Sequence, residues 1–487
     1  MTLPDEPAAS SRPLLPQTAG CPWEACDVVA VALVGAWLCS VVEIWPIPIS
    51  PIVYLPFVLL AVGWRTLAPW FSALLRYWTV RLLFVVYAYF ILSELSTGLG
   101  YAQISQSGRW VAGGLALMCL AAYARSHPVR LVRLVSTVGL LLTFSLLWFV
   151  IELRVGAPFI AWRELLYRDL YANVPRWLFE NTRSGLTPWI HLLGYQIAAV
   201  APLLALPILL ARRSILVRIA FATQFVAFTL LFIAIWFSAQ RAALLASVAV
   251  VVVFPIIFRT RRALLVSCLI VAAAGMARLA VDEATVTLVP TYAETDTPGE
   301  PVPAVPEMPA RRWGNQTLDA TLGDKFFKDI YRSELVFRLK LQQRALFLIL
   351  SSPLGLERAG RTWNIDGLKY VRDSHPVFYA RTIGVHNSVL AYSLSAGWVI
   401  FVPAVLMLLG VGAISGQLLM WAMREPMWLS AVGCAVVISL LNLTLLEAMT
   451  HNASLLNQEA TSMVFLSLLL ALDLFRRTPV DVVPLAS

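Results

Sequence analysis

Long runs of apolar residues recur along the whole chain and are separated by shorter polar stretches. Windows of about 19 residues, the length that crosses the hydrocarbon core as a helix, locate twelve such runs. They lie near 27–45, 50–64, 80–98, 109–124, 131–151, 187–211, 214–237, 241–258, 263–281, 386–414, 427–446 and 460–475. The run 50–64 is short and contains Pro51 and Pro56, so we expect a broken span there. The pattern predicts an all-α polytopic membrane protein with about twelve transmembrane helices.

The spacing of these runs also predicts how the chain is organised. A tail of residues 1–26 precedes helices 1–9 in 27–281, which include a long loop at 152–186. A second, much longer loop occupies 282–385, and its opening stretch 290–309 is rich in Pro, Glu and Thr, as irregular solvated segments are. Helices 10–12 lie in 386–476 and a tail follows at 477–487.

The composition agrees with membrane insertion and narrows the class of protein. Of the 487 residues, 59% are hydrophobic and only 13% are charged, whereas a soluble domain carries about 25% charged residues. The chain also has 17 tryptophans, a residue enriched at both membrane interfaces. We expect membrane lipids as partners and no nucleic acid.

Basic residues are distributed unevenly over the short loops, and this predicts the orientation. Loops that follow every second run carry arginine, whereas 46–49 and 447–459 contain no Lys or Arg, and 99–108 has none before Arg109. The arginines of the first group are Arg65, Arg76, Arg81, Arg125, Arg130, Arg212, Arg213, Arg218, Arg259, Arg261, Arg262, Arg424, Arg476 and Arg477. Because cytoplasmic loops carry the excess of Lys and Arg, both termini are expected in the cytoplasm and both long loops outside.

The two long outer loops are rich in arginine although they lie on the side where it should be scarce. This predicts an electropositive surface for anions such as phosphates, the alternative being a solvated face whose arginines extend to the interface. Within the larger loop, 326–350 has helical periodicity, with Phe337, Leu341, Ala345 and Leu348 on one stripe and a stop at 351–353. This segment is expected either to lie on the membrane surface or to pack against the spans.

Candidate chemistry is concentrated where the larger loop re-enters the membrane. His386 and Asn387 begin the run 386–414, and a neutral imidazole there could accept a proton from a hydroxyl. A histidine at a helix start can equally be a cap or an interface residue, and His127 before Pro128 reads as structural. The acidic residues do not converge as metal ligands must, and neither a P-loop nor a glycine-rich dinucleotide motif occurs. We therefore expect no metal and no cofactor, and the six cysteines read as packing residues.

Three segments together resemble the O-antigen ligase and polymerase superfamily of bacterial membrane glycosyltransferases. Residues 181–186, Asn-Thr-Arg-Ser-Gly-Leu, are similar to the family's Arg-x-Gly approach to a helix. Residues 238–242, Ser-Ala-Gln-Arg-Ala, resemble its short Ser-Arg-Gly-Ala turn. The longest match runs from Arg338 through a helix to Pro353 and Gly355, and then from His386-Asn387 to Gly397. Gln342 departs from the family pattern, since many members have Trp there, and Gln240 interrupts the short turn.

The resemblance implies an activity, a site and a location. It implies a GT-C-like fold in the bacterial inner membrane, with an active site that faces the periplasm. The donor would be a glycan on undecaprenyl pyrophosphate, and the acceptor in the ligase branch would be a sugar hydroxyl of lipid A–core. His386 would be the general base of an inverting, metal-independent transfer, while Arg338, Arg241 and Arg183 would bind the pyrophosphate. Asn387 and Gln342 would support these residues.

Other functions fit parts of the pattern. An O-antigen polymerase or a protein O-oligosaccharyltransferase of the same superfamily would share the His-Asn loop. A lipid or solute transporter is the alternative from a different class, but transporters place ionisable groups at mid-membrane and use inverted repeats. The unusual charge of this chain lies in its outer loops instead, which favours an enzyme at the membrane interface.

Overall fold

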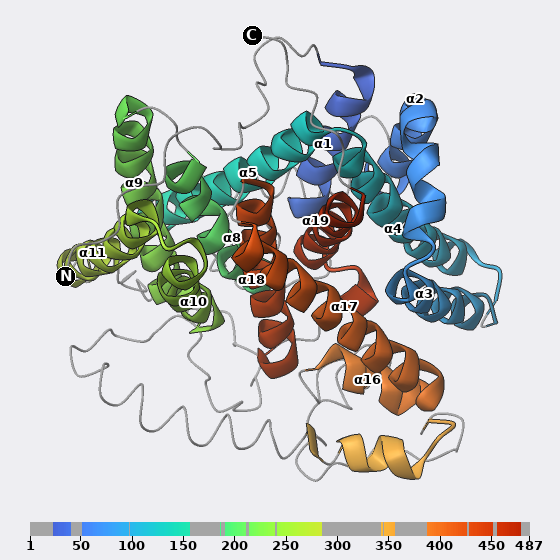
Figure 1. Cartoon of the computed structure of the whole chain (residues 1–487). Helices are drawn as coiled ribbons and strands as arrows, with labels where there is room; N and C mark the ends of the chain where they lie inside the picture. Colours follow the sequence, from blue (N-terminus) through green and yellow to red (C-terminus); the bar gives the residue numbers. More distant parts are fainter. Residues whose placement is uncertain are drawn as a thin grey trace, which may run out of the picture.

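The computed structural model of the chain describes residues 23–39, 51–96, 98–155, 186, 190–210, 214–238, 241–284, 342–343, 345–355, 387–425, 428–450 and 455–478. Within these ranges the regular structure is entirely helical, and Figure 1 shows the helices gathered into one bundle. The helices are α1 (Ala25–Leu38), α2 (Pro51–Leu74), α3 (Trp78–Ser96), α4 (Tyr101–Ser126), α5 (Pro128–Val155), α8 (Ile190–Leu210), α9 (Ser214–Ser238), α10 (Arg241–Phe258), α11 (Arg261–Ala284), α16 (Ser388–Ala396), α17 (Trp398–Arg424), α18 (Trp428–Thr450) and α19 (Ala460–Arg477), with a 3₁₀ turn η3 (Leu455–Asn457). A further short helix covers 345–351.

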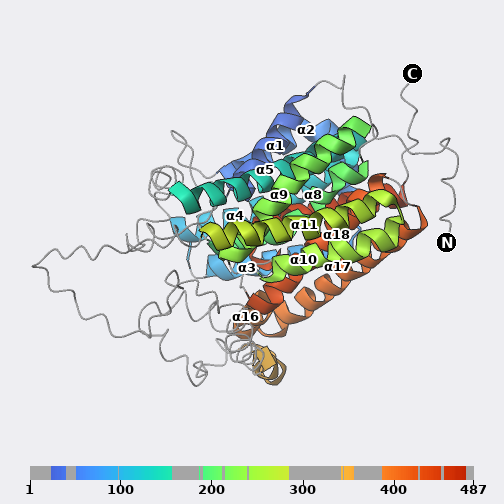
Figure 2. The same ribbon diagram turned by 90° about the vertical axis from the view of Figure 1, so that its left-hand side faces the viewer.

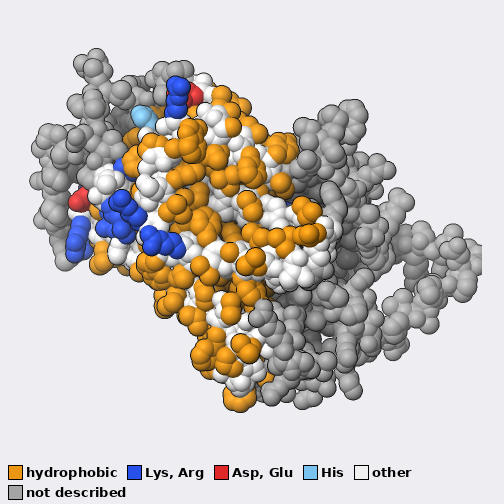
Figure 3. Space-filling view, turned by 90° about the vertical axis from the view of Figure 1, so that its right-hand side faces the viewer, with side chains coloured by type: hydrophobic (Ala, Val, Ile, Leu, Met, Phe, Trp, Pro, Cys, Tyr) orange, Lys and Arg blue, Asp and Glu red, His pale blue; other side chains and the backbone are white. Residues whose placement is uncertain are grey.

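The all-helical membrane class predicted from the apolar runs is confirmed. Each predicted run overlaps a helix of the described chain. Seven of these helices are long and apolar enough to cross a membrane, namely those at Pro51–Leu74, Trp78–Ser96, Pro128–Leu153, Leu193–Leu210, Ile215–Trp236, Arg261–Val281 and Trp398–Arg424. Figure 3 shows hydrophobic side chains over most of one face of the bundle, with Lys and Arg toward one end. The total of twelve spans and the GT-C-like topology stay predictions.

Two boundary predictions are wrong, and both concern residues that usually break helices. The second span is not broken, because α2 runs from Pro51 through Pro56 and Pro69 to Leu74, and Arg65 lies within it rather than in a loop. Pro51 occupies the first helical position, where its missing N–H costs nothing. The run 386–414, in contrast, is divided at Gly397, which ends α16 and precedes α17 with φ 69°.

Two prolines inside helices are accommodated by a neighbouring helix, which binds the carbonyl group that each proline frees. Pro202 in α8 has no N–H for the carbonyl of Ala198, and Asn442 of α18 donates its side-chain amide to that oxygen at 2.7 Å. In α10, Pro255 likewise frees the carbonyl of Val251, which accepts a hydrogen bond from the Ser267 hydroxyl of α11 at 2.9 Å. Since hydrocarbon offers no water to such groups, these contacts fix which helices pack together.

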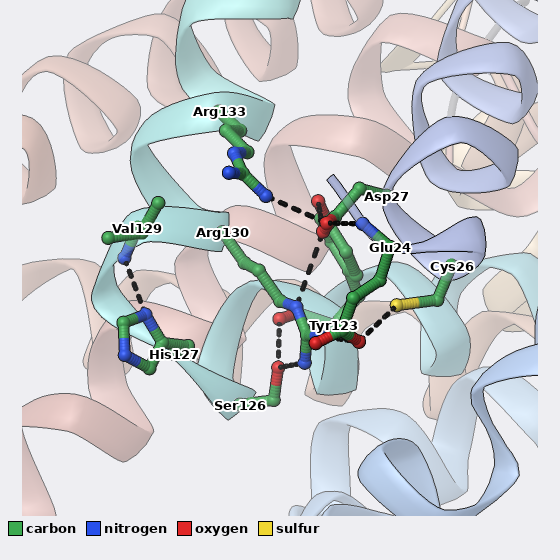
Figure 4. Close-up of polar contacts among 9 residues, drawn as sticks. All are labelled: Glu24, Cys26, Asp27, Tyr123, Ser126, His127, Val129, Arg130 and Arg133. Atoms are coloured by element: carbon green, nitrogen blue, oxygen red, sulfur yellow. Dashed lines mark hydrogen bonds and ion pairs between the residues drawn. The ribbon is translucent and has the colours of Figure 1, made fainter. Parts of the chain in front are cut away.

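A buried carboxylate joins α1, α4 and α5 at the end of the bundle where α4 turns into α5, which we call the α4–α5 end. Asp27 is 1% exposed, and its two oxygens accept from the Tyr123 hydroxyl at 2.7 Å and from Arg133 at 2.7 Å. Arg130 bridges Asp27 and Glu24, at 3.3 Å and 2.6 Å (Figure 4). Because a buried charge is costly unless it is paired, this cluster holds the three helices in register.

A second carboxylate makes a matching junction at the same end. Asp473 of α19 is fully buried and accepts hydrogen bonds from the Tyr77 hydroxyl, which precedes α3, and from Arg476 and Arg477. Arg476 also donates to the Gln417 side chain of α17 at 2.6 Å. The arginines predicted to share the cytoplasmic side after α4 and α19 therefore lie at one end of the bundle. Their orientation in a membrane stays a prediction.

Candidate functional site

The residues predicted to carry the chemistry are only partly within the described chain. His386, Arg338 and Arg183 lie outside the described residues. Arg241 is the first residue of α10, and its side chain is outside the described part. Asn387 and Gln342 are both described, so the structure gives the surroundings of the site and the elements that lead into it.

Asn387 has a definite structural role as the N-cap of α16. Its backbone is extended (φ −151°, ψ 116°), and its side-chain oxygen accepts from the N–H of Leu390 at 3.1 Å. Asparagine is among the best N-cap residues because it satisfies an N–H that the helix leaves free. His386 therefore directly precedes the cap residue of α16. This position agrees with an orienting function for Asn387 rather than a reacting one.

Gln342 is helical and half-buried, and the helix 345–351 that follows packs against α16. Ala345 and Ile349 are buried in a small cluster with Leu394, against which Leu348, Leu390 and Phe401 also pack. The predicted stripe is confirmed at Ala345 and Leu348, while its other members, Phe337 and Leu341, lie outside the described residues. The helix ends at Ser351, as predicted. The described end of this segment packs against α16, whereas 326–341 lies outside the described residues.

The opposite face of helix 345–351 is apolar and exposed. Leu346, Phe347, Leu350 and Leu354 project away from the cluster, and Figures 1 and 2 both show this helix beside α16 at the edge of the bundle. Apolar side chains at such an edge suit the membrane interface, where one helix face packs on protein and another meets lipid.

A tight turn fastens this helix to the junction between α16 and α17. The backbone N–H of Trp398 donates to the carbonyl of Pro353 at 2.8 Å, and the Trp398 indole N–H donates to the carbonyl of Ile349 at 3.0 Å. Gly355 and Gly397, both with positive φ, lie where the two segments touch. We call Pro353, Gly355, Gly397 and Trp398 the glycine clasp. Pro353, Gly355 and Gly397 belong to the segments that carry the family resemblance, and Trp398 directly follows them.

The helix directions place the start of α10 and Leu186 at the same end of the bundle as the clasp. Asp27 ties the start of α1 to the α4–α5 end, whereas Gln196, early in α8, donates to the carbonyl of Leu38 at the far end of α1. α8 therefore begins opposite the α4–α5 end. α9 returns to that opposite side, and Arg241 begins α10 there. The backbone N–H of Leu186, three residues after Arg183, donates to the Ser145 hydroxyl in the second half of α5.

An aromatic cluster beside α16 was not anticipated from the sequence. Phe90 stacks on Trp110 with ring centroids 4.7 Å apart, and Tyr392 of α16 lies 4.9 Å from Phe90. Tyr87 lies 5.3 Å from Trp110 and donates its hydroxyl to the carbonyl of Leu455 in η3 at 2.8 Å. These rings hold α16 against α3, α4 and η3. The aromatic positions late in the run 80–98 are the only sequence signal that could have indicated it.

The loop after η3 ends in a buried acidic cap. The two oxygens of Glu459 accept from the N–H groups of Thr461 at 2.9 Å and Ser462 at 2.6 Å, at the start of α19. Burial raises the pKa of Glu459, and the hydrogen bonds from Ser462 and Thr461 act in the opposite direction. The cap fixes the end of the loop that supports the aromatic cluster.

Two observations concern the other titratable side chains of the described chain. Among the described residues, His, Cys, Asp and Glu side chains do not gather in threes that could hold a metal ion. His127 accepts from the N–H of Val129 at 3.2 Å in the α4–α5 turn, where burial and the nearby Arg130 and Arg133 lower its pKa. The structural reading of His127 is therefore confirmed.

Comparison with known protein families and curated proteins found no relative of this chain. The chain matches no known protein-family model, and no curated protein is similar to it in sequence. Any statement about its activity consequently depends on its own residues and on how they are arranged.

Proposed function

We propose that this protein is a membrane glycosyltransferase of the O-antigen ligase type. It would transfer a glycan from undecaprenyl pyrophosphate to a sugar hydroxyl of lipid A–core, at the periplasmic face of a bacterial inner membrane. The all-helical, membrane-embedded fold is the part of this proposal with direct structural support.

The observation that carries the proposal is the meeting of two motif segments that are distant in the chain. Residues 356–386 separate Gly355 from Asn387, yet Pro353 and Gly355 contact Gly397 and Trp398 directly. A chance likeness in an amphipathic loop gives no reason for the Pro-x-Gly segment and the distant Gly397 to form one unit. A shared functional site does.

The chemistry assigned to the site is a displacement at the anomeric carbon of the donor. The His386 imidazole would remove the proton from the acceptor hydroxyl as its oxygen bonds to that carbon, while the bond to the pyrophosphate oxygen breaks. Arg338, Arg241 and Arg183 would stabilise the charge that grows on the leaving pyrophosphate. Guanidinium groups suit this role because they bind phosphate oxygens in pairs.

The α4–α5 end of the bundle supports an enzyme rather than a transporter. Alternating access would require this end to open, yet Asp27 joins α1, α4 and α5, and Asp473 with its partners joins α17, α19 and Tyr77. The guanidinium of Arg125 also lies between the rings of Trp70 and Phe475, 4.1 Å and 4.4 Å from their centroids. Opening would expose or unpair these charges.

The proposal is tested by deleting the gene in its host and examining the lipopolysaccharide. Complete lipid-linked polymer together with unmodified core would support a ligase. Core that carries single repeat units would indicate a polymerase, and unchanged lipopolysaccharide would refute both.

Single substitutions then test the residue roles. His386→Ala should abolish transfer while the protein stays folded in the membrane, and Arg338→Lys should lose most activity because a point charge cannot replace the two-pronged guanidinium. His127→Ala is the matched control, since this histidine lies in the α4–α5 turn away from the proposed site. Normal core decoration by His386→Ala would rule out the base assignment.

A further inference from the structure

The glycine clasp adds hydrogen bonds between the end of helix 345–351 and the start of α17. The carbonyl of Ile349 lies four residues before Pro353, which has no N–H to offer it, and the N–H of Ser352 reaches it at 3.4 Å. The indole N–H of Trp398 is a second and closer donor, at 3.0 Å. The backbone N–H of Trp398 is itself one of the donors that a helix start leaves free, and it is bound by the carbonyl of Pro353. The fit is therefore reciprocal.

Both glycines of the clasp are required by conformation and by space. Gly355 has φ 81°, and Gly397 has φ 69° with ψ −146°, a combination close to the region that only glycine adopts readily. A Cβ atom on Gly355 would overlap the carbonyl oxygen of Ser395 and lie 2.8 Å from the nitrogen of Gly397. A Cβ atom on Gly397 would overlap the carbonyl oxygen of Pro353. Because these neighbours are backbone atoms, an alanine at either position must push the two segments apart.

Each segment leads directly to a residue of the proposed site. Helix 345–351 follows Gln342, and Arg338 lies four residues further back in the chain. α16 begins after Asn387, which His386 precedes. We propose that the glycine clasp is a positioning device that holds the helical segment after Gln342 in a fixed place beside α16, the helix capped by Asn387. This inference rests on the proposed function, and its residues act through others rather than on substrate.

The expected effect follows from how strictly transfer depends on geometry. A displacement of about 1 Å at a reacting group can cost roughly 100-fold in rate. Gly397→Ala and Gly355→Ala should therefore lower kcat by about that factor. The KM for the lipid-linked donor should change less than kcat, because two of the three proposed pyrophosphate-binding residues, Arg241 and Arg183, lie outside the two clasped segments of the sequence.

The test uses the full-length protein in membranes, with Gly412→Ala as the matched control. Gly412 lies in α17, like the clasp residue Trp398, but a Cβ atom there would meet nothing within 4 Å. Trp398→Phe is a milder clasp variant that keeps an aromatic ring at this position and removes the indole N–H that donates to Ile349. It keeps the proposal testable if the glycine variants do not fold, and it should lower kcat less than they do.

Cysteine cross-linking reports the clasp separately from activity. Leu348 and Leu390 pack against the same small cluster from the two segments, so Leu348→Cys with Leu390→Cys should be joined by a short bifunctional maleimide. Cross-linking should decrease in the Gly397→Ala background and stay unchanged with Gly412→Ala. Joining the two cysteines in the Gly397→Ala protein should restore part of the lost turnover, which a role in folding alone would not produce.

The outcomes distinguish this inference from the proposed function. Unchanged kcat in folded Gly397→Ala would overturn the positioning role, whether or not the cross-link is lost. A wild-type protein with no glycan transfer would refute the proposed function and the positioning role with it. In that case the cross-link would still report whether the two segments are clasped.

Discussion

The bond from Asn442 to the carbonyl freed by Pro202 offers the sharpest test of how this fold is held together. Asn442 is 4% exposed, and its amide N–H reaches the carbonyl oxygen of Ala198 at 2.7 Å. Asn442→Ala leaves that oxygen without a donor, because position 202 has no N–H. An unsatisfied buried carbonyl costs about 1–3 kcal/mol, whereas interhelical hydrogen bonds in membrane proteins average about 0.6 and reach about 1.7 kcal/mol.

The expected loss lies at the low end of the first range, where the two ranges overlap, for a structural reason. The other side-chain atom of Asn442, Oδ1, has no hydrogen-bond partner among the described residues. Burial of this unpaired oxygen already destabilises the wild-type protein, and the substitution to alanine removes that cost. The net loss of stability on Asn442→Ala is therefore smaller. We expect Asn442→Ala to lower the free energy of unfolding by about 1 kcal/mol.

A double-mutant cycle with Pro202→Ala separates this mechanism from a simple loss of packing. Alanine at 202 restores an N–H to the helix, so Ala198 regains a partner within α8. Asn442→Ala should then cost about 1 kcal/mol less than in the wild type. The measurement is reversible unfolding in mixed detergent micelles, and an equal cost in both backgrounds would refute the reasoning. Thr444→Val is the control in the same helix, because the carbonyl of Leu440 that Thr444 binds also has its own helical N–H donor.

Two further predictions concern buried carboxylates. Asp27→Ala should lower the free energy of unfolding by about 3–5 kcal/mol, because it leaves Arg130 and Arg133 buried without Asp27 as their counter-charge. Tyr123→Phe, which removes only a hydrogen bond to Asp27, should cost about 1 kcal/mol. A loss for Asp27→Ala no larger than that for Tyr123→Phe would contradict this reasoning. The pKa of Glu459 is raised on folding, so its contribution to stability is greatest below its unfolded value of about 4.3 and is lost as the pH rises. Glu459→Gln should therefore gain in melting temperature relative to wild type as the pH rises above about 4.3, and a difference independent of pH would refute the shift.

The apolar runs predicted the helices well because a membrane helix must bury a long continuous stretch of apolar residues. Helix ends were predicted less well, and prolines account for much of the difference. Pro51 and Pro56 were expected to break the second span, but α2 begins at Pro51 and continues past Pro56 and Pro69 to Leu74. Whether a proline ends a helix depends on what its neighbours can do for the freed carbonyl, and no local pattern records this.

Gly397 illustrates the opposite error. The run 386–414 reads as one uninterrupted helix, yet its division into α16 and α17 follows from contact with Pro353 and Gly355. The resemblance marked these residues as members of one motif without indicating that they touch. They meet although residues 356–386 separate the two segments, and no spacing in the sequence could predict this contact.

The sequence by itself determined that the protein is helical and embedded in a membrane. It also predicted that the arginines after α4 and α19 share an end, because hydropathy and arginine placement are local properties that the bilayer constrains. Tertiary structure alone decided which polar groups pair across helices, as in Asp27 with Arg130 and Asn442 with Ala198. It also decided that the helix before Pro353 is fastened to the start of α17. Such pairings depend on where distant segments meet when apolar surface and buried polar groups must be satisfied together.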